Sequence, residues 1–119
     1  MSRKMTIGVG NLDQSAKRFV ETWRKVERGE KVSRQERVTF DNLETLLRTL
    51  TPSRWALLRK LRRQGPMTVR ALAKTLGRDY KNVHTDVRTL ETVGLLSRDK
   101  ESRVMVPWDT VVAEVTLAA

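Results

Sequence analysis

The sequence predicts a mainly α-helical fold with a small β component, and three observations support this class. Five segments place apolar residues at helical spacing, and each begins at a residue that can cap a helix. Glycines follow four of these segments, where the chain must turn. Short apolar runs near both ends of the chain, and after the last helical segment, have the character of strands.

The N-terminal part is predicted as a strand followed by a helix. Residues 4–9 alternate apolar and polar side chains, which is typical of a short strand. Asn11 can cap the helix that follows, with Gln14 as its reciprocal partner, and Gly29 ends it. Residues 38–40 then form a brief extended segment. The apolar face of the helix comprises Ala16, Phe19, Val20, Trp23 and Val26.

Two further helices are predicted to meet at Thr51. Asp41 is expected to cap the first, with Glu44 completing a capping box. Thr51 caps the second, and Pro52 takes its first position, where a missing N–H costs nothing. One side of the first helix is lined by Leu43, Leu46, Leu47 and Leu50. In the second, the inward residues are Trp55, Leu58 and Leu61, and the outward ones are Arg59, Lys60, Arg62 and Arg63.

The next two helices are predicted to lie on either side of a tight turn. Thr68 caps the first, which ends at Gly77. Asp79 caps the second, which runs to about Val93 before Gly94 stops it. The expected inward residues are Val69, Leu72, Ala73 and Leu76 in the first helix and Val83, Val87 and Leu90 in the second.

A hairpin and a last strand complete the expected layout. Leu95 and Leu96 begin one strand, residues 98–103 form a charged turn, and residues 104–106 return. Pro107 interrupts the ladder because it lacks an N–H. Residues 111–117 then alternate apolar and polar side chains and are predicted as a C-terminal strand.

Positive charge is concentrated in the middle of the chain. The 119 residues carry 24 Lys+Arg and 14 Asp+Glu, a net charge of +10. Residues 51–107 hold 13 basic and 5 acidic side chains, so they carry +8 of it, against +4 for residues 1–50 and −2 for residues 108–119. We therefore predict three parts: an N-terminal extension (1–50), a basic domain (51–107) and a C-terminal strand or tail (108–119).

Composition restricts the chemistry available to the chain. There is no cysteine, so disulfides, thiol catalysis and cysteine-ligated metals are excluded, and His84 is the single histidine. We find no glycine-rich phosphate loop, no carboxylate pair with a supporting histidine and no metal set, so we expect no enzyme, no cofactor and no metal. No secretory signal or membrane-length apolar run is present, which favours a soluble, cytoplasmic protein.

Three small or buried positions in the basic domain have the spacing of a helix-turn-helix. Ala73 lets two helices approach closely, Gly77 permits a left-handed turn, and Val83 packs the second helix onto the first. The hairpin after Gly94 makes this a winged variant. The fold prediction is therefore a winged helix-turn-helix with an N-terminal strand-helix extension and a C-terminal strand.

A basic winged helix-turn-helix predicts binding to double-stranded DNA, since a pI near 10.9 favours a polyanionic partner. Helix 79–93 would enter the major groove through its N-terminal half, with Arg88 as the best candidate for a bidentate contact to guanine. The wing, residues 97–104, would lie on the backbone. The candidate DNA-binding residues are Thr68, Arg70, Arg78, Tyr80, Lys81, Asn82, His84, Thr85, Arg88, Arg98, Lys100 and Arg103.

A family resemblance adds to this interpretation. It spans about residues 50–110 and is most specific in the run Gly77-Arg78-Asp79-Tyr80-Lys81-Asn82-Val83-His84, flanked by residues 65–73 and by Leu90-Glu91 and Gly94-Leu95. This part of the chain resembles a family of small prokaryotic winged-helix proteins, described as predicted transcriptional regulators of MarR/ArsR-like type. The resemblance implies sequence-specific binding of duplex DNA, and some relatives resemble antitoxins that pair with a small toxin.

Plainer interpretations stand beside these. Winged helices also bind RNA or proteins, and a basic chain can bind an anionic membrane surface. Tyr80 could cap the core rather than contact phosphate, and His84 could simply pack against Tyr80. The wing cations could be an ordinary charged hairpin tip, because Asp99 and Glu101 partly cancel them. The basic residues of helix 52–64 are expected to form a solvated face.

Apolar segments outside the basic domain predict association. One small domain cannot easily bury the helix that carries Trp23, the leucine helix 41–50 and the terminal strands as well. We therefore expect a homodimer that represses a promoter by occupying it. A toxin partner, if there is one, would contact the N-terminal part or the acidic tail.

Overall fold

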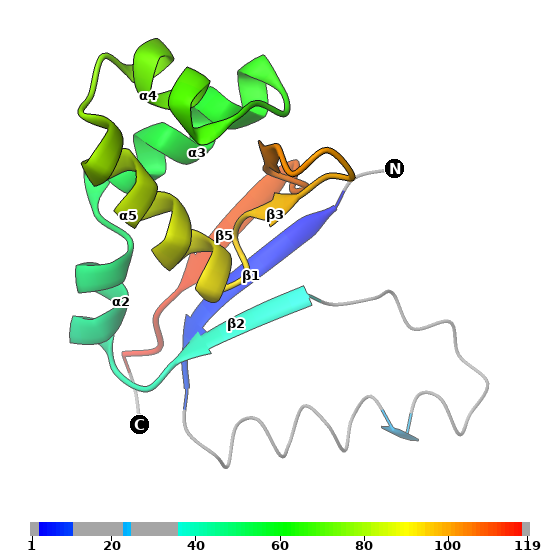
Figure 1. Ribbon diagram of the computed structural model, residues 1–119. Coiled ribbons are helices and arrows are strands. Elements are labelled where there is room, and N and C mark those ends of the chain that lie inside the picture. Colours follow the sequence, from blue (N-terminus) through cyan, green and yellow to red (C-terminus); the bar gives the residue numbers. More distant parts are fainter. Residues whose placement is uncertain (1–2, 11–22, 25–35, 118–119) are drawn as a thin grey trace.

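The computed structural model describes residues 3–10, 23–24 and 36–117, which form a mixed α/β fold (Figure 1). Trp23 and Arg24 are helical and exposed. The rest of the helix predicted after Asn11 lies outside the described residues, and so does most of its apolar face. The remaining predicted segments can be compared with the structure one by one.

Three strands from distant parts of the chain form one parallel sheet. β1 (Lys4–Val9) lies in the centre, with β2 (Glu36–Phe40) on one side and β5 (Thr110–Glu114) on the other. In register, Ile7 lies opposite Val38 and Ala113. The strands expected at the two ends of the chain are confirmed, and the extended segment 38–40 is the end of β2. β5 is shorter than expected, because residues 115–117 extend past its pairing with β1.

The two faces of the sheet differ. Met5 and Ile7 point into the core and are 4% and 0% exposed. On the opposite face, the Arg37 side chain passes over Gly8 towards Glu114, whose carboxylate lies 4.0 Å from the guanidinium. A Cβ at Gly8 would stand 3.0 Å from that guanidinium, so the glycine leaves room for the side chain to cross β1.

Four helices follow β2, and their beginnings match the expected caps with one exception. They are α2 (Leu43–Thr49), α3 (Pro52–Gln64), α4 (Val69–Leu76) and α5 (Tyr80–Thr92). The side chains of Thr51, Thr68 and Asp79 accept the expected backbone N–H bonds. The prediction that Asp41 caps α2 is wrong: Asn42 is the cap, and its side chain accepts the N–H of Thr45 at 2.8 Å, so the helix begins one residue later.

The leucine face of α2 is narrower than predicted. Leu46 and Leu50 are buried at 5% and 4% exposure, whereas Leu43 and Leu47 are 36% and 61% exposed. A single stripe of residues four apart faces the core in this seven-residue helix, and Leu43 and Leu47 lie on the neighbouring stripe.

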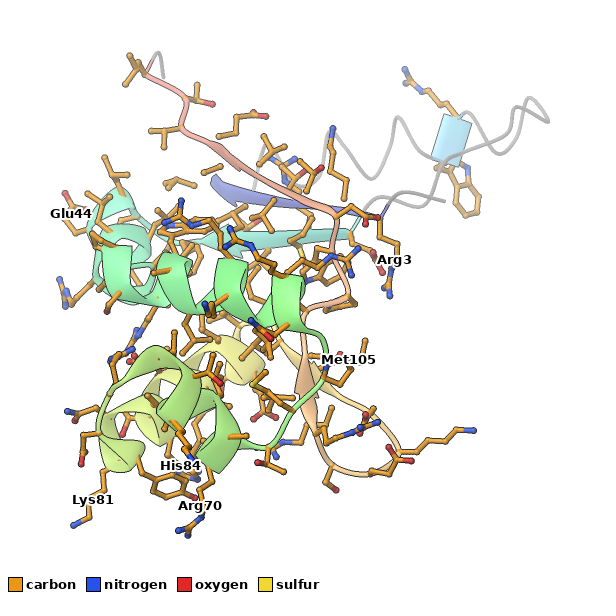
Figure 2. All side chains as sticks on the ribbon, turned by 90° about the horizontal axis from the view of Figure 1, so that it is seen from above. Arg3, Glu44, Arg70, Lys81, His84 and Met105 are labelled. Atoms are coloured by element: carbon orange, nitrogen blue, oxygen red, sulfur yellow. The ribbon has the colours of Figure 1, made fainter. Side chains whose placement is uncertain are left out.

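The inward face of α3 differs from the prediction at two positions, Leu57 and Trp55. Leu57 is fully buried with Leu61, and Leu58 is 5% exposed, whereas Trp55 is only half-buried. Leu57 and Leu61 are four residues apart, so they share the stripe that points to the centre of the core. Figure 2 shows α3 between the sheet on one side and α4 and α5 on the other.

The turn between α4 and α5 depends on Gly77. Its φ of 65° lies in the left-handed region, and its N–H donates to the carbonyls of Ala73 and Lys74. The N–H of Arg78 donates to Ala73 as well, at 3.0 Å. This left-handed cap directs the chain into α5, as the sequence predicted. The inward residues expected for α4 and α5 are buried, except Leu76, which is partly buried.

A short hairpin follows α5. β3 (Ser97–Arg98) pairs antiparallel with β4 (Val104–Met105), and Val104 also pairs with Met67, which precedes α4. The prediction that the hairpin begins at Leu95 is wrong, because the N–H groups of Leu95 and Leu96 turn back to the carbonyl of Leu90. The return strand ends one residue earlier than predicted, before Val106.

One apolar core joins the sheet to the helices. Ile7, Leu61, Leu72 and Leu90 are fully buried in it, and Trp108 donates its indole N–H to the carbonyl of Leu95 at 3.2 Å. The expected N-terminal, basic and C-terminal segments therefore contribute to the same core. Within the described ranges, no helix is long and apolar enough to cross a lipid bilayer.

Candidate nucleic-acid interface

α5 separates apolar and polar residues onto two faces. Val83, Val87 and Leu90 are fully buried, which fixes the orientation of the helix. The opposite face turns away from the sheet, on the side where Figure 2 places Lys81 and His84 with Arg70 of α4. The predicted contact residues on this outer face are Tyr80, Lys81, Asn82, Thr85 and Arg88, all exposed, and His84, which is half-buried.

Three side chains at the start of α4 and α5 stack on one another. The guanidinium of Arg70 lies 5.1 Å from the centre of the Tyr80 ring. The Tyr80 ring is 5.8 Å from that of His84, with 39° between the two planes. Tyr80 is 42% exposed, so it is not a cap of the core. His84 does pack against Tyr80, and the stack connects the starts of the two helices.

Several cations on this surface have no carboxylate partner. Among the described residues, no Asp or Glu oxygen lies within 4.0 Å of the charged groups of Arg70, Lys81 or Arg88. Ion pairs elsewhere in the described structure involve other basic residues. The outer face of α5 and the start of α4 therefore form a surface with uncompensated positive charge, which we call the α4–α5 face (Arg70, Tyr80, Lys81, His84 and Arg88).

The hydroxyl groups on this face are used partly by the backbone. Thr68 accepts the N–H of Ala71 at 3.1 Å and thereby caps α4. Thr85 donates to the carbonyl of Lys81 at 3.0 Å. Both side chains are exposed, so their oxygens are open to a further partner. Asn82 is exposed as well, and its backbone N–H is bound by the cap residue Asp79.

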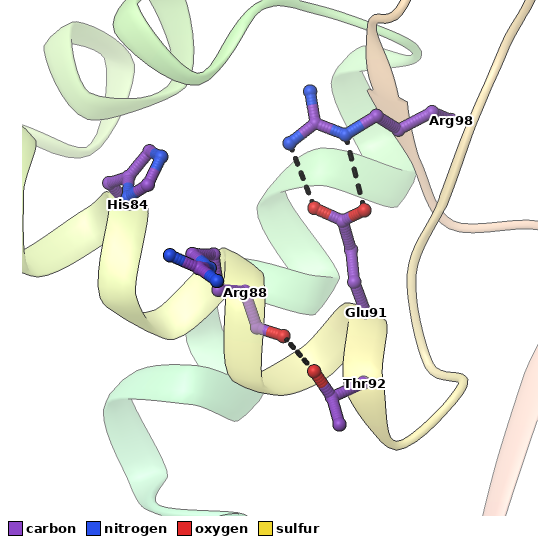
Figure 3. Close-up of a pocket in the computed structure, with 5 residues that line it drawn as sticks. All are labelled: His84, Arg88, Glu91, Thr92 and Arg98. Atoms are coloured by element: carbon purple, nitrogen blue, oxygen red, sulfur yellow. Dashed lines mark hydrogen bonds and ion pairs between the residues drawn. The ribbon is translucent and has the colours of Figure 1, made fainter.

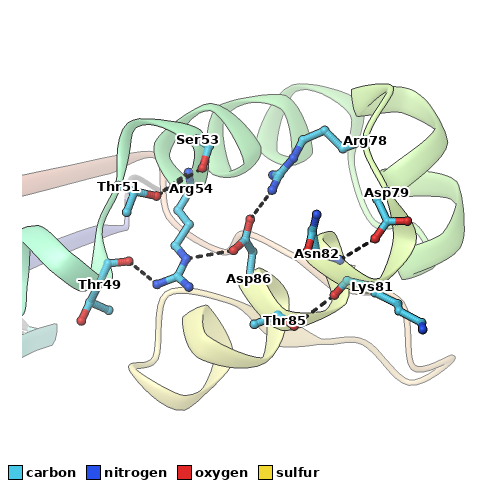
Figure 4. A network of polar contacts seen from close by, with 10 residues as sticks. All are labelled: Thr49, Thr51, Ser53, Arg54, Arg78, Asp79, Lys81, Asn82, Thr85 and Asp86. Atoms are coloured by element: carbon cyan, nitrogen blue, oxygen red, sulfur yellow. Dashed lines mark hydrogen bonds and ion pairs between the residues drawn. The ribbon is translucent and has the colours of Figure 1, made fainter.

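Arg78 lies apart from the other predicted contacts. Its side chain turns inward to the carboxylate of Asp86, with 2.8 Å between Nη2 and Oδ2 (Figure 4). Arg54 of α3 binds the other oxygen of Asp86 at 3.0 Å and donates to the carbonyl of Thr49 at 2.7 Å. This network joins α3, the α4–α5 turn and α5, and Arg78 is only partly exposed.

Sequence reasoning missed this network, although a signal was present. Asp86 occupies the position between Val83 and Leu90 on the buried stripe of α5, and it is 8% exposed. A carboxylate at an apolar position of an amphipathic helix implies a buried cationic partner, because an unpaired buried charge is too costly. The sequence alone does not show which of its many arginines is that partner.

The hairpin cations are paired with carboxylates. Arg98 binds both oxygens of Glu91 on α5, at 2.8 and 3.1 Å, and donates to the carbonyl of Ser102 at 3.1 Å (Figure 3). The hydrogen bond with Glu91 raises the pKa of the Arg98 guanidinium. Glu91 was not among the predicted site residues. It connects the hairpin to the helix that carries the α4–α5 face.

Arg103 is held within the hairpin itself. It pairs with Asp99, 2.8 Å away, and with Glu101. The hydrogen bond from the Arg103 backbone N–H lowers the pKa of the Asp99 carboxyl. Lys100 stands exposed at the tip, beside Ser102, whose φ of 63° closes the turn. Of the three predicted hairpin contacts, Lys100 is therefore the one without a carboxylate within 4.0 Å in the described structure.

A shallow depression lies between α5 and the hairpin. It measures about 330 Å³ and is lined by His84, Arg88, Glu91, Thr92 and Arg98 (Figure 3). Two guanidinium groups and one imidazole against one carboxylate suit an anionic group. In the parts of the chain that the structure describes, no three His, Asp or Glu side chains gather to hold a metal ion.

Comparison with known proteins defines a family. The HVO_A0114 family matches residues 49–113, which is more than half of the chain, and the chain belongs to this family. The match extends from the end of α2 into β5 and includes the α4–α5 face, the hairpin and the Asp86 network. No curated protein and no solved structure matches the chain.

Proposed function

We propose that the chain is a sequence-specific regulator of transcription that binds double-stranded DNA. The observation that supports this most is the α4–α5 face, where Arg70, Lys81 and Arg88 are exposed without a carboxylate partner in the described structure. Uncompensated cations beside hydrogen-bonding side chains suit a surface that binds phosphates and reads base edges. In this proposal residues 51–107 act as a winged helix-turn-helix.

The proposed mechanism assigns a task to each part of the surface. α5 enters the major groove, where Arg88 makes a bidentate contact to guanine and Asn82 contacts an adjacent base. Arg70 and Thr68, at the start of α4, bind phosphate. Lys81, His84 and Thr85 add base or phosphate contacts. Arg78 positions α5 through Asp86 rather than touching DNA.

The wing offers fewer unpaired positive charges in the free protein than its composition implies. Arg98 and Arg103 are paired with carboxylates, so phosphate has to compete with Glu91, Asp99 and Glu101 for them. Lys100 is the wing cation available for a first contact with the backbone. The depression between α5 and the hairpin is where a phosphate would lie between Arg88 and Arg98.

We further propose that the regulator acts as a homodimer in the cytoplasm. Leu43 and Leu47 of α2 leave a stripe of apolar surface outside the DNA-facing side. A two-fold dimer would place two copies of α5 in successive major grooves about 34 Å apart, on a palindromic site. Such a dimer would repress transcription by covering a promoter.

An antitoxin role is the second candidate. It is favoured by the exposed apolar residues at the far end of the chain, since Val115 and Leu117 are 39% and 95% exposed. Residues 108–119 carry two acids and no base, but Asp109 pairs with Arg62 and Glu114 lies 4.0 Å from Arg37, so the exposed apolar side chains are the surface that a partner would bind. In that case the chain would bind its toxin through these parts and its own promoter through the α4–α5 face. Co-purification with the product of a neighbouring gene would distinguish the two roles.

Selection from random duplex DNA, with single-stranded RNA as competitor, tests the proposal. We expect enrichment of a palindromic sequence that RNA does not displace. Affinity for the selected site should then fall with salt, with a slope in log–log form of about −0.9 per phosphate neutralised. Recovery of no sequence, together with an affinity that does not change with salt, would favour a protein-interaction module instead.

A further inference from the structure

A second hollow lies away from the α4–α5 face, between α3 and the chain that follows the hairpin. It measures about 440 Å³, within the range of about 300–1,000 Å³ typical of small-molecule sites. Two kinds of side chain line it. The apolar wall includes Trp55, Leu58 and Trp108, and the basic rim is Arg59, Arg62 and Arg63.

The apolar wall is held in a fixed position. Trp108 is 7% exposed, its indole N–H donates to the carbonyl of Leu95 at 3.2 Å, and the Arg3 guanidinium lies 4.7 Å from the ring centre. Leu58 belongs to the core at 5% exposure. The indole ring of Trp108 is therefore constrained before any ligand arrives, which lowers the entropy cost of binding against it.

The rim carries more positive than negative charge. α3 contains no acidic residue, and the one carboxylate at the hollow is Asp109, which pairs with Arg62. Asp109 also accepts the backbone N–H of Arg3 at 2.8 Å, so both of its oxygens are occupied. In the described structure, no carboxylate lies within 4.0 Å of Arg59 or Arg63.

We propose that this hollow, the α3 groove, binds a small organic anion with an aromatic or similarly bulky apolar body. The body would lie against Trp55, Leu58 and Trp108, and the carboxylate would face Arg59 and Arg63. A bare phosphate would satisfy the arginines but leave the partly exposed ring of Trp55 uncovered, and a neutral hydrocarbon would cover that ring but leave the arginines without a counter-charge. A ligand with both parts matches both kinds of lining. This site is separate from the proposed DNA surface and does not depend on it.

Titration of the full chain with 2-naphthoate tests the proposal, followed through the indole N–H signals in nitrogen-15 NMR spectra. The chain has three tryptophans, so each signal reports one place. We expect saturable shifts of Trp55 and Trp108 and none of Trp23. The neutral isostere 2-naphthamide should bind about tenfold more weakly, because it lacks the carboxylate that the arginines attract.

Two neighbouring residues of α3 provide a matched pair of variants. Arg59→Gln should weaken 2-naphthoate about tenfold, since Arg59 lines the groove. Lys60→Gln removes the same charge one residue along and is expected to leave the affinity unchanged, because Lys60 does not line it.

Four results would overturn the proposal. The first is no saturable indole shift up to about 10 mM naphthoate. The second is equal affinity for naphthoate and naphthamide, and the third is equal binding and equal indole shifts with inorganic phosphate. The fourth is an equal effect of the two variants, which would indicate general charge attraction. The titration contains no DNA, so its failure leaves the proposed regulator function standing.

Discussion

Glu91 and Arg98 form a two-point ion pair that ties α5 to the hairpin. The two contacts measure 2.8 and 3.1 Å, and the side chains are 28% and 37% exposed. The pair closes one side of the depression that Arg88 also lines. Under the proposed function, Glu91 therefore competes with DNA phosphate for the wing arginine.

Replacing Glu91 by Gln should strengthen DNA binding. The change releases Arg98 for phosphate, so we expect affinity for the selected site to rise about threefold to tenfold and the salt slope to steepen by about 0.9. Fluorescence anisotropy over a salt series measures both. Glu44→Gln on α2 is the matched control, since it removes the same charge far from the hairpin. An equal gain in the control would indicate that net charge alone is responsible.

Replacing Arg88 by Ala should weaken binding to the selected site by about 1–3 kcal/mol and relax the preference at one base pair. Arg88 is exposed on α5, so its loss is not expected to disturb the core. Arg48→Ala, an exposed arginine on α2, removes equal charge from another surface. Unchanged base preference in the Arg88 variant would show that α5 does not read the groove in this orientation.

Replacing Asp86 by Asn should destabilise the fold. Asp86 is 8% exposed and pairs with both Arg54 and Arg78, which would lose their counter-charge while remaining partly buried. We expect a loss of about 3 kcal/mol in the free energy of unfolding, at the lower end for removal of one partner of a buried pair. Urea denaturation gives the value. The control is Asp79→Asn, where Asn caps a helix as well as Asp.

Replacing Gly77 by Ala should cost about 1 kcal/mol, because its φ of 65° is strained for an L-residue. A Cβ there would meet no atom within 4 Å, so the cost comes from the backbone conformation and not from a clash. Gly77→Asn should cost less, since Asn tolerates the left-handed region. Equal losses for the two variants in thermal unfolding would contradict this explanation.

Asp109 should contribute to stability above pH 4 and cease to do so in acid. The backbone N–H of Arg3 lowers the pKa of its carboxyl from the ordinary 3.8, and Arg62 lowers it further. A carboxyl whose pKa is lower in the folded state than in the unfolded state stabilises the fold at pH values above its unfolded-state pKa. This contribution is lost as the pH falls through the folded-state pKa. The difference in Tm between the natural chain and Asp109→Asn should therefore be constant above about pH 5 and shrink below about pH 4.

Local signals in the sequence were sufficient to predict most of the helices. A cap and a following apolar stripe act over a few residues, so Thr51, Thr68 and Asp79 mark helix starts without any knowledge of the rest of the fold. The turn at Gly77 follows from the same local chemistry. The prediction that Asp41 caps α2 failed because its neighbour Asn42 is an equally good cap, and sequence alone does not distinguish the two.

Partners distant in the chain could not be predicted. Nothing in residues 4–9 indicates that they pair with residues 110–114, because alternation shows a strand but not its neighbour. The candidate site likewise has a part that local sequence predicts and a part that depends on distant elements. The exposed positions of α5 follow from its helical period, whereas the pairing of Arg98 with Glu91 and of Arg78 with Asp86 depends on how the elements meet.

The central place of β1 has a consequence for how the chain is made. β1 is synthesised before one of its two neighbours, β5, which follows about a hundred residues later. Until then the hydrogen-bonding edge of β1 that β5 will occupy stays open, and such an edge can recruit other chains. Truncation before Thr110 should therefore yield a protein that associates through β1, whatever the state of its helices.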